Sequence, residues 1–163
     1  METGLSNKVV LVTGGAGGIG EEICKAFASE GSKVIVHYHS SSENAAKIAD
    51  EIQGFSIKAD LTKLSETKLM FEKIIGKYDR IDVCIANAGY YPPEPLPLWD
   101  IDSERWKKTI SSNLDVSVNT ARSFLKHASK NKSGSIVFIG STAGIYGESG
   151  HSDYAAAKGA ITS

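Results

Sequence analysis

Short runs of β-branched and other apolar residues alternate along this chain with longer segments whose apolar residues recur at helical spacing. The alternation is typical of βαβ units, in which a crossover helix returns the chain to the next parallel strand. The sequence therefore predicts an α/β fold with one parallel sheet. The predicted strands cover 8–12, 33–38, 55–58, 81–86 and 135–140, and the predicted helices cover 19–29, 43–52, 65–77, 103–130 and a last segment from about Ser152.

The predicted strands are apolar without a break, as in Val-Val-Leu-Val and Ile-Val-Phe-Ile. This pattern indicates burial on both faces, so we expect helices above and below the sheet. Short oxygen-bearing side chains accept the unpaired N–H groups of a first helical turn, so Asp102 or Ser103 is expected to cap the fourth helix and residues 60–62 to start the third. The four prolines, at 92, 93, 95 and 97, predict a non-helical loop over 90–98.

The length of the chain limits the number of domains that it can form. Its 163 residues are 41% hydrophobic, which is enough apolar material for one buried core, so we expect a single domain over 1–163. A sheet that ends on its fifth strand, followed by a helix that stops at Ser163, is an unusual place for such a domain to finish. The expectation is that the C-terminal part of the fold is absent from this sequence.

Charge and apolar length give no reason to expect a nucleic acid or a membrane as partner. Lys and Arg number 18 against 19 Asp and Glu, so nothing in the charge suggests a nucleic acid or an anionic membrane surface. No apolar stretch approaches the roughly 20 residues that span a bilayer, and no secretory signal is visible, so we expect a cytoplasmic protein. Cys24 and Cys84 lie in apolar segments, which favours packed thiols over a disulfide or a metal site.

A glycine-rich segment, Thr13-Gly14-Gly15-Ala16-Gly17-Gly18-Ile19-Gly20, joins the first predicted strand to the first predicted helix. Glycine permits a positive φ and lets backbone N–H groups approach a phosphate, which the positive end of the following helix also attracts. The glycines can be read as G-x-G-x-x-G (Gly15, Gly17, Gly20) or as T-G-x-x-x-G-x-G (Gly14, Gly18, Gly20). Because a strand precedes them and a helix follows, the segment predicts a dinucleotide site in a Rossmann-type, doubly wound sheet.

The second spacing resembles the cofactor motif of the short-chain dehydrogenase/reductase family, and the resemblance extends from about Lys8 to the last residue. Asn87-Ala88-Gly89 resembles the family's N-A-G motif, and Asp60 with Leu61 resembles the segment that contacts adenine. The resemblance implies one NAD(P)-binding domain whose cofactor-binding residues are Thr13, Gly14, Gly18, Ile19, Gly20, Asp60, Leu61, Asn87, Ala88, Gly89, Tyr154 and Lys158.

Asn113, Ser141, Tyr154 and Lys158 match the family's catalytic residues in the family's order. Tyr154 and Lys158 are four residues apart, on one helix face, and Ser141 follows a predicted strand at the edge where parallel sheets bind ligands. The resemblance implies hydride transfer between a nicotinamide and a carbonyl or alcohol carbon. Tyr154 would then be the acid and Ser141 would bind the substrate oxygen. Lys158 would favour the phenolate and hold the nicotinamide ribose, while Asn113 would support a water chain to solvent.

The residues that end the second predicted strand bear on the choice of cofactor. An NAD site of this kind usually presents an acid there, whereas this chain reads His37-Tyr38-His39-Ser40-Ser41-Ser42. No carboxylate repels a 2′-phosphate, and His39, Ser40 and Ser41 can donate hydrogen bonds to one. The absence of Arg and Lys from this stretch and from the glycine turn leaves NAD open, but the sequence favours NADP.

The sequence constrains the substrate less than the cofactor. The segment Tyr-Ala-Ala-Ala-Lys-Gly-Ala-Ile is similar to that of 3-oxoacyl-acyl-carrier-protein reductases, whereas the proline-rich loop from Tyr90 to Trp99 is similar to that of sugar or polyol dehydrogenases. Both assignments imply a small carbonyl or alcohol substrate. A non-catalytic dinucleotide-binding module is a third interpretation, favoured by the missing C-terminal part. The resemblance also implies a homo-oligomer, commonly a tetramer.

Overall fold

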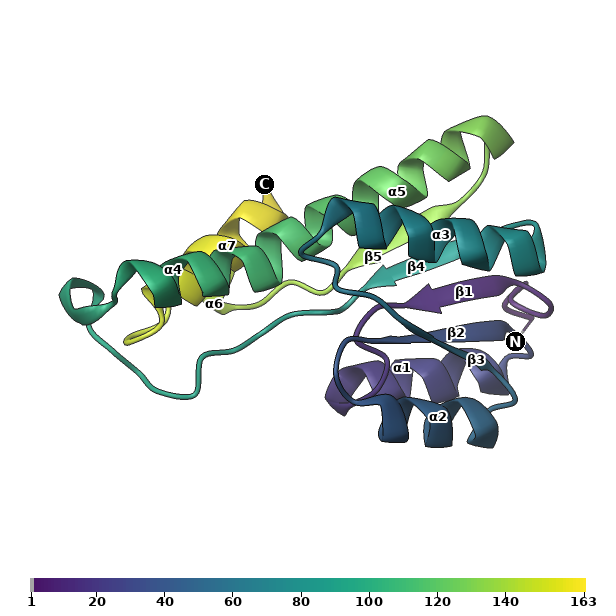
Figure 1. Ribbon diagram of the computed structural model, residues 1–163, viewed down its shortest axis with the longest axis horizontal. Coiled ribbons are helices and arrows are strands. Elements are labelled where there is room, and N and C mark those ends of the chain that lie inside the picture. Colours follow the sequence, from purple (N-terminus) through teal and green to yellow (C-terminus); the bar gives the residue numbers. More distant parts are fainter. Residues whose placement is uncertain (1) are drawn as a thin grey trace.

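The computed structural model describes residues 2–163, in which five parallel strands form one sheet in the order β3-β2-β1-β4-β5 (Figure 1). The predicted α/β fold is confirmed, because this order and the helices on both faces define a doubly wound, Rossmann-type sheet. The strands are β1 (Val9–Val12), β2 (Lys33–Tyr38), β3 (Phe55–Lys58), β4 (Val83–Ala86) and β5 (Ser135–Phe138).

The helices fall into two groups (Figure 1). Helices α1 and α2 pack on one face of the sheet and α3 and α5 on the other, whereas α4, α6 and α7 lie together beyond the carboxyl ends of the strands. Their bounds are α1 (Gly18–Ser29), α2 (Ser42–Glu51), α3 (Leu64–Tyr78), α4 (Ser103–Ile110), α5 (Val116–Asn131), α6 (Ala143–Tyr146) and α7 (Ser152–Thr162), with short turns η1 (Leu98–Asp100) and η2 (Ser111–Asp115).

Alternate residues of the central strand β1 pack into two separate cores. Val9 and Leu11 join the core beneath α3 and α5, which contains Phe124. Val10 and Val12 join the core beneath α1 and α2. Because successive side chains of a strand point to opposite faces, a strand covered on both sides is apolar at every position.

Strand β5 does not follow this pattern, and the expectation that it is buried on both faces is wrong. Val137 is 47% exposed and Phe138 is 40% exposed. The reason is position, since β5 is an edge strand that pairs only with β4 and is covered chiefly by α5. Cys24 and Cys84, by contrast, are buried free thiols, one in each core, as the sequence predicts.

The long fourth helix and the third helix differ in detail from the prediction. The helix predicted over 103–130 is present, but it changes winding at η2, a π-helical turn between α4 and α5. Asp102 caps α4, because its carboxylate accepts a first-turn N–H at 2.7 Å. Helix α3 (Leu64–Tyr78) agrees with the predicted range 65–77 within one residue, but residues 60–62 do not start it, since the carboxylate of Asp60 accepts the Thr62 N–H at 3.0 Å in a turn that precedes the helix.

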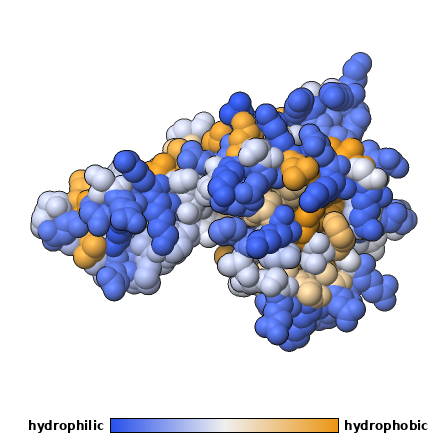
Figure 2. Space-filling model, viewed as in Figure 1, coloured by the Kyte–Doolittle hydropathy of each residue, from blue (hydrophilic) through white to orange (hydrophobic). Residues whose placement is uncertain are grey.

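On the face shown in Figure 2, hydrophobic residues are scattered among hydrophilic ones rather than gathered in one large patch. The most exposed large apolar side chains, Trp99 at 86% and Tyr146 at 84%, belong to η1 and α6, beyond the carboxyl ends of the strands. Within residues 2–163, none of the helices combines the length and the apolar character needed to cross a membrane.

Candidate active site

The glycine turn runs from the end of β1 into α1. Gly14 has a φ of +63°, and a Cβ at this position would lie 2.9 Å from the Cα of Ala88. A Cβ on Gly20 would lie 2.1 Å from the Gly14 carbonyl oxygen. Gly20 belongs to both readings, but Gly14 and Gly18 have positive φ values of +63° and +50°, which Gly15 and Gly17 lack, so the geometry favours the reading that begins at Thr13-Gly14.

Thr13 and Asn87 join the glycine turn to the N-A-G segment after β4. The Thr13 hydroxyl accepts the N–H groups of Asn87 and Ala88, each at 3.0 Å. In return, the Asn87 side-chain amide donates to the carbonyl oxygens of Thr13 at 3.0 Å and Gly14 at 3.2 Å. These reciprocal bonds fix the two segments against each other at the carboxyl edge of the sheet.

A pocket of about 280 Å³ opens beside the glycine turn, between that turn and the end of β2. Its walls include the backbone of Gly14 and Gly17 on one side and His39, Ser40 and Ser41 on the other. No carboxylate lines it among the described residues. The pocket therefore offers backbone N–H groups, hydroxyls and an imidazole, which suit an anionic ligand better than a cationic one.

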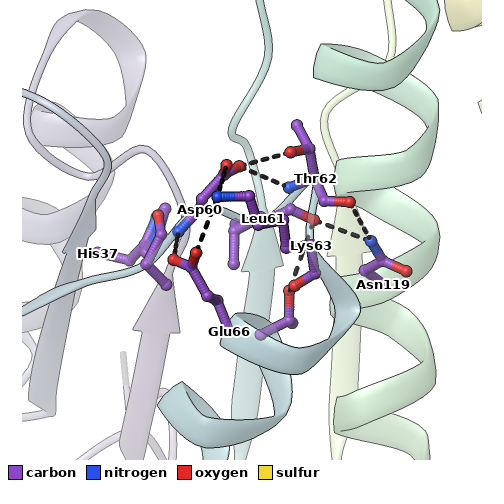
Figure 3. Close-up of polar contacts among 9 residues, drawn as sticks. His37, Asp60, Leu61, Thr62, Lys63, Glu66 and Asn119 are labelled. Atoms are coloured by element: carbon purple, nitrogen blue, oxygen red, sulfur yellow. Dashed lines mark hydrogen bonds and ion pairs between the residues drawn. The ribbon is translucent and has the colours of Figure 1, made fainter.

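Asp60 and Leu61 form the loop after β3, at the same edge of the sheet (Figure 3). The Asp60 carboxylate accepts the Thr62 hydroxyl at 2.6 Å and lies 3.2 Å from the Lys63 ammonium. Its own N–H donates to Glu66 at 2.9 Å. Partial burial acts to raise the pKa of Asp60, but the hydrogen bonds from Thr62 and Lys63 outweigh it and lower that pKa, so the group is anionic at neutral pH.

Asn113 lies in the π-helical turn η2 and is completely buried. Its side-chain amide donates to the carbonyl oxygens of Tyr90 at 2.8 Å and Thr109 at 2.9 Å, and its oxygen accepts the Tyr90 N–H at 3.2 Å. A Cβ on Gly89 would lie 2.8 Å from this oxygen, so the N-A-G segment passes close to the side chain. Asn113 thus holds the chain segment after β4 against η2, the turn that precedes α5.

Ser141 directly precedes the α6 region, and Tyr154 and Lys158 lie on α7, which packs against α6. The Ser141 hydroxyl accepts an N–H at the start of α6 at 3.2 Å. A Cβ on Gly144 would lie 2.6 Å from the backbone of Lys158, which shows how tightly the two helices meet. The Lys158 ammonium lies 5.8 Å from the centre of the Tyr154 ring and donates to the Ile139 carbonyl oxygen at 2.9 Å.

The environment of Lys158 is that of a buried cation. The residue is 5% exposed, and desolvation lowers the pKa of its ammonium. None of the acidic residues in 2–163 forms an ion pair with it. A Cβ on Gly89 would lie 3.6 Å from the ammonium, so Lys158 reaches from α7 to the N-A-G segment. The cation therefore lies between the predicted cofactor segment and the Tyr154 ring.

On the loop side, the ring of Tyr91 lies against Tyr154 and is itself held by His151 and Glu148. The Tyr91 ring meets it edge to face, with centres 5.0 Å apart, and stacks on the His151 ring at 4.5 Å. The Tyr91 hydroxyl donates to a Glu148 carboxylate oxygen at 2.5 Å. This hydrogen bond raises the pKa of Tyr91, because it stabilises the protonated phenol beside a carboxylate.

Asp153 anchors the start of α7, one residue before Tyr154. It is completely buried, and its carboxylate accepts the Arg105 guanidinium at 3.1 Å and the Thr109 hydroxyl at 2.9 Å. Burial acts to raise the pKa of Asp153, but the bonds from Arg105 and Thr109 lower it overall. The pair ties α4 to α7 and so fixes the helix that carries Tyr154 and Lys158.

All the predicted site residues therefore lie along one edge of the sheet, but several polar residues that hold them were not predicted. Asn44 of α2 donates to the Ala16 carbonyl oxygen at 2.6 Å. Asn119 of α5 donates to the carbonyl oxygens of Leu61 at 2.9 Å and Thr62 at 3.2 Å (Figure 3). Neither asparagine has a sequence signal, because its partner is distant in the chain. His37 has one, since it is polar in an otherwise apolar strand.

The described residues contain no cluster of three or more His, Cys, Asp or Glu side chains that could hold a metal ion. The chemistry available at this edge is that of backbone N–H groups, hydroxyls, a phenol and an ammonium. These groups bind phosphates and move protons, and they supply no electron acceptor of their own.

Comparison with known proteins identifies the family of the chain. The profile of the family described as short chain dehydrogenase matches residues 8–163, and the chain belongs to that family. It is 36% identical over 162 residues to a 3-oxoacyl-acyl-carrier-protein reductase of Thermotoga maritima, covering 96% of this chain and 65% of the relative. A reductase of the same name from Synechocystis is 33% identical, with 98% of this chain and 66% of the relative covered.

An L-fucose dehydrogenase of Rattus norvegicus is also similar, at 31% identity over 96% of this chain and 57% of the relative. The chain thus spans less than two thirds of the length of these curated relatives. The relatives differ in the substrates that their names state. Family membership is therefore secure, whereas the substrate is a matter for proposal.

Proposed function

We propose that the protein is an oxidoreductase that transfers a hydride between NADP(H) and the carbon of a carbonyl or alcohol group. The observation that carries the proposal is that the Lys158 ammonium lies 5.8 Å from the centre of the Tyr154 ring and donates to the Ile139 carbonyl oxygen, just after β5 and two residues before Ser141, at the sheet edge that also holds the glycine turn. Ligands of open parallel sheets bind at this edge. The similarity to reductases and dehydrogenases of named activity supports the same class of reaction.

A dinucleotide phosphate fits the residues present. The turn offers a surface without side chains, since nothing lies within 4 Å of a Cβ placed on Gly17 or Gly18. The first turn of α1 has N–H groups without partners inside the helix, which favours a pyrophosphate there. Gly14 and Gly17 would face the phosphates, while His39, Ser40 and Ser41, with no acid among them, would accept a ribose 2′-phosphate. This supports NADP over NAD.

The bound cofactor supplies or accepts the hydride, and the protein supplies the proton and the polar surroundings. In reduction, negative charge develops on the substrate oxygen, and the Tyr154 hydroxyl donates its proton to that oxygen. In oxidation the phenolate accepts the proton back. The buried Lys158 ammonium, 5.8 Å from the ring centre, stabilises the phenolate electrostatically. The Ser141 hydroxyl donates a hydrogen bond to the same substrate oxygen and so orients it.

For the substrate we propose a 3-oxoacyl thioester first, because two similar relatives carry that name and align over nearly the whole chain. A sugar or polyol is the second candidate. One feature of the site favours it, namely the Tyr91 hydroxyl and the Glu148 carboxylate beside Tyr154, since hydroxyl-rich ligands need such acceptors and donors. The fucose dehydrogenase among the relatives agrees with this second candidate.

The deciding experiment pairs turnover with cofactor binding. Wild-type protein is expected to bind NADPH more tightly than NADH and to oxidise NADPH in the presence of a 3-oxoacyl thioester or a panel of sugars and ketones. Tyr154→Phe should keep NADPH binding and lose turnover by about 10²–10⁴-fold, because it removes only the transferable proton. Lys158→Met is the matched variant that should lose both turnover and part of the NADPH affinity.

Three results would contradict the proposal. Failure of the wild-type protein to bind either dinucleotide would remove the cofactor site. Turnover by Tyr154→Phe at the wild-type rate would remove the acid–base role of Tyr154 while leaving the site itself in place. NADPH binding without turnover of any carbonyl would instead support a non-catalytic dinucleotide-binding module.

A further inference from the structure

His37 is a buried imidazole in the middle of an apolar sheet. It lies in β2 with 2% of its surface exposed, in the sequence Val-Ile-Val-His-Tyr. A buried polar group is costly unless its hydrogen-bonding atoms have partners, and both ring nitrogens have one. The Gly14 N–H donates to Nδ1 at 3.0 Å, and Nε2 lies 3.1 Å from the Ala59 carbonyl oxygen.

These two partners determine the protonation of the ring. A backbone N–H can only donate, so Nδ1 must carry a lone pair. A carbonyl oxygen can only accept, so Nε2 must carry the hydrogen. His37 is therefore a neutral imidazole in the Nε2-protonated form. Burial of the ring, which lowers the pKa of His37 to about 4, agrees with this neutral state at physiological pH.

The two bonds cross the sheet in opposite directions. Gly14 follows β1, the neighbour of β2 on one side, and Ala59 follows β3, the neighbour on the other. Ala59 directly precedes Asp60, so the ring connects the glycine turn to the loop drawn in Figure 3. His37 also lines the pocket of about 280 Å³ between the glycine turn and the end of β2. One side chain thus contacts that pocket and joins the glycine turn to the Asp60 loop.

The bond to Gly14 has a partner on the far side of the same peptide group. The carbonyl oxygen of the Thr13–Gly14 peptide accepts the Asn87 side-chain amide at 3.0 Å, while its N–H donates to His37 at 3.0 Å. A peptide group is planar and rigid, so holding both ends fixes its orientation. The carbonyl oxygen of His37 also accepts the Gly15 N–H at 2.9 Å, which holds the next peptide of the turn.

We propose that His37 is a positioning residue of the dinucleotide site: its imidazole holds the Thr13–Gly14 peptide opposite Asn87 and thereby orients the glycine turn for phosphate binding. The proposal rests on the proposed function, since it assumes that the turn binds a dinucleotide. It goes beyond that function by giving a role to a residue that contacts no reacting atom. It also predicts that the Gly14 bond matters for binding and that the Ala59 bond matters less.

Two substitutions separate the two bonds. His37→Asn places an amide oxygen near the position of Nδ1, so it can still accept the Gly14 N–H but loses Ala59. His37→Gln reaches the position of Nε2, so it can still donate to Ala59 but leaves the Gly14 N–H without a partner. NADPH titration by fluorescence measures the dissociation constant of each protein, and thermal unfolding without cofactor measures its stability.

The expected result is that His37→Asn binds NADPH within about threefold of wild type, while His37→Gln binds roughly tenfold more weakly, the usual effect of one lost hydrogen bond in a buried site. Equal NADPH affinity of the two variants, whether near that of wild type or weaker, would overturn the proposal. A histidine with only a structural role would change the unfolding temperature, but the loss of the Nδ1 bond would not weaken NADPH binding more than the loss of the Nε2 bond. If wild type itself binds no dinucleotide, the proposed function fails and not this inference alone.

A measurement on the wild-type protein keeps the proposal testable even if a variant does not fold. Side-chain ¹⁵N NMR at neutral pH should show His37 protonated at Nε2 only, and NADPH should shift its Nδ1 resonance together with the Gly14 amide. A ring protonated at Nδ1, or resonances of both groups that do not respond to bound NADPH, would overturn the proposal.

Discussion

The two halves of the candidate site are built differently. On the cofactor side, the glycine turn is held by buried or half-buried polar bonds from Thr13, His37, Asn44 and Asn87, which come from β1, β2, α2 and the segment after β4. On the substrate side, the ring of Tyr154 meets the exposed Tyr91, and the neighbouring Tyr146 is 84% exposed. In the first half, side chains bond to the backbone of the turn, whereas the loop-side contact of Tyr154 in the second half is made by an exposed side chain.

The difference between the two sides indicates where amino-acid changes are tolerated. A dinucleotide offers phosphates, which backbone N–H groups recognise, so the cofactor side needs a fixed main chain and little side-chain identity. Substrates differ from one enzyme to another, and side chains on loops can change without disturbing a sheet. Relatives named for a thioester and for a sugar share one framework, in agreement with this division.

The largest expected effect on the cofactor side is a change in the free energy of unfolding with pH. Burial first, and the nearby His39 charge to a smaller extent, lower the pKa of His37 from 6.5 to about 4, against a weaker opposing effect of the Ala59 bond. Between pH 6.5 and 4 the unfolded chain binds a proton that the folded protein does not. The free energy of unfolding should therefore fall as the pH falls through this range, by about 3 kcal/mol at most.

Urea unfolding at pH 7.0, 6.0, 5.0 and 4.5 measures this dependence. The carboxylates of Asp60, Glu66, Asp82 and Asp153, whose pKa values are lowered, lose stability mainly below pH 4.5, so the interval from 6.5 to 4.5 isolates the histidine. His37→Asn should flatten the curve over that interval. An unchanged slope in this variant would show that the cofactor side owes no pH dependence to the buried ring.

A second test compares two glycines of the same turn. Gly14→Ala places a side chain at a φ of +63° and 2.9 Å from the Cα of Ala88, so it should cost at least about 1–2 kcal/mol of folding free energy and weaken NADPH binding. Gly17 has an extended φ of −176° and nothing within 4 Å of a Cβ. Gly17→Ala should keep the stability and lose NADPH affinity, because the added methyl occupies the phosphate side of the pocket.

Thermal unfolding and NADPH titration of both proteins check this pair. If both variants lost stability equally, the turn would be constrained along its whole length rather than at the points that contact Asn87 and Ala88. If Gly17→Ala bound NADPH as wild type does, the phosphates would lie elsewhere, and the pocket beside the turn would not be the cofactor site.

The sequence predicts most of the fold because its main signals are local. An apolar run bounded by turn residues marks each strand, so all five observed strands lie within two residues of the expected bounds at each end. The exposed face of β5 could not be predicted, since an apolar strand does not reveal whether a helix covers it. The surroundings of Asn113 in the π-helical turn could not be predicted either, since its side chain bonds to Tyr90, which only folding brings near.

The residues of the candidate site also fall into those that local sequence predicts and those that depend on distant partners. Tyr154 and Lys158 are predictable because both lie on one helix at a fixed spacing. The residues that position them are not, since Asp153 acts through Arg105, which is distant in the chain. His37 shows the intermediate case, because a polar residue in an apolar strand is visible in the sequence but its partners, Gly14 and Ala59, are not.

The smallest expected effect concerns the substrate side, where Tyr91 meets Tyr154. Tyr91→Phe keeps the ring against Tyr154 and removes the hydrogen bond to Glu148, so kcat should change by less than about threefold. Tyr91→Leu removes the edge-to-face contact, worth about 0.5–1.5 kcal/mol, so Tyr154 is less restrained and kcat should fall by roughly three- to tenfold.

Steady-state kinetics with a thioester and a sugar sharpen this last prediction into a choice of substrate. If the hydroxyl and carboxylate beside Tyr154 bind a polyol, Tyr91→Phe and Glu148→Gln should each raise KM for the sugar and leave KM for the thioester unchanged. If both variants leave both KM values unchanged, the Tyr91–Glu148 pair serves only to hold the loop. The cofactor side and the substrate side would then be more alike, because residues that contact no ligand would position both of them through hydrogen bonds.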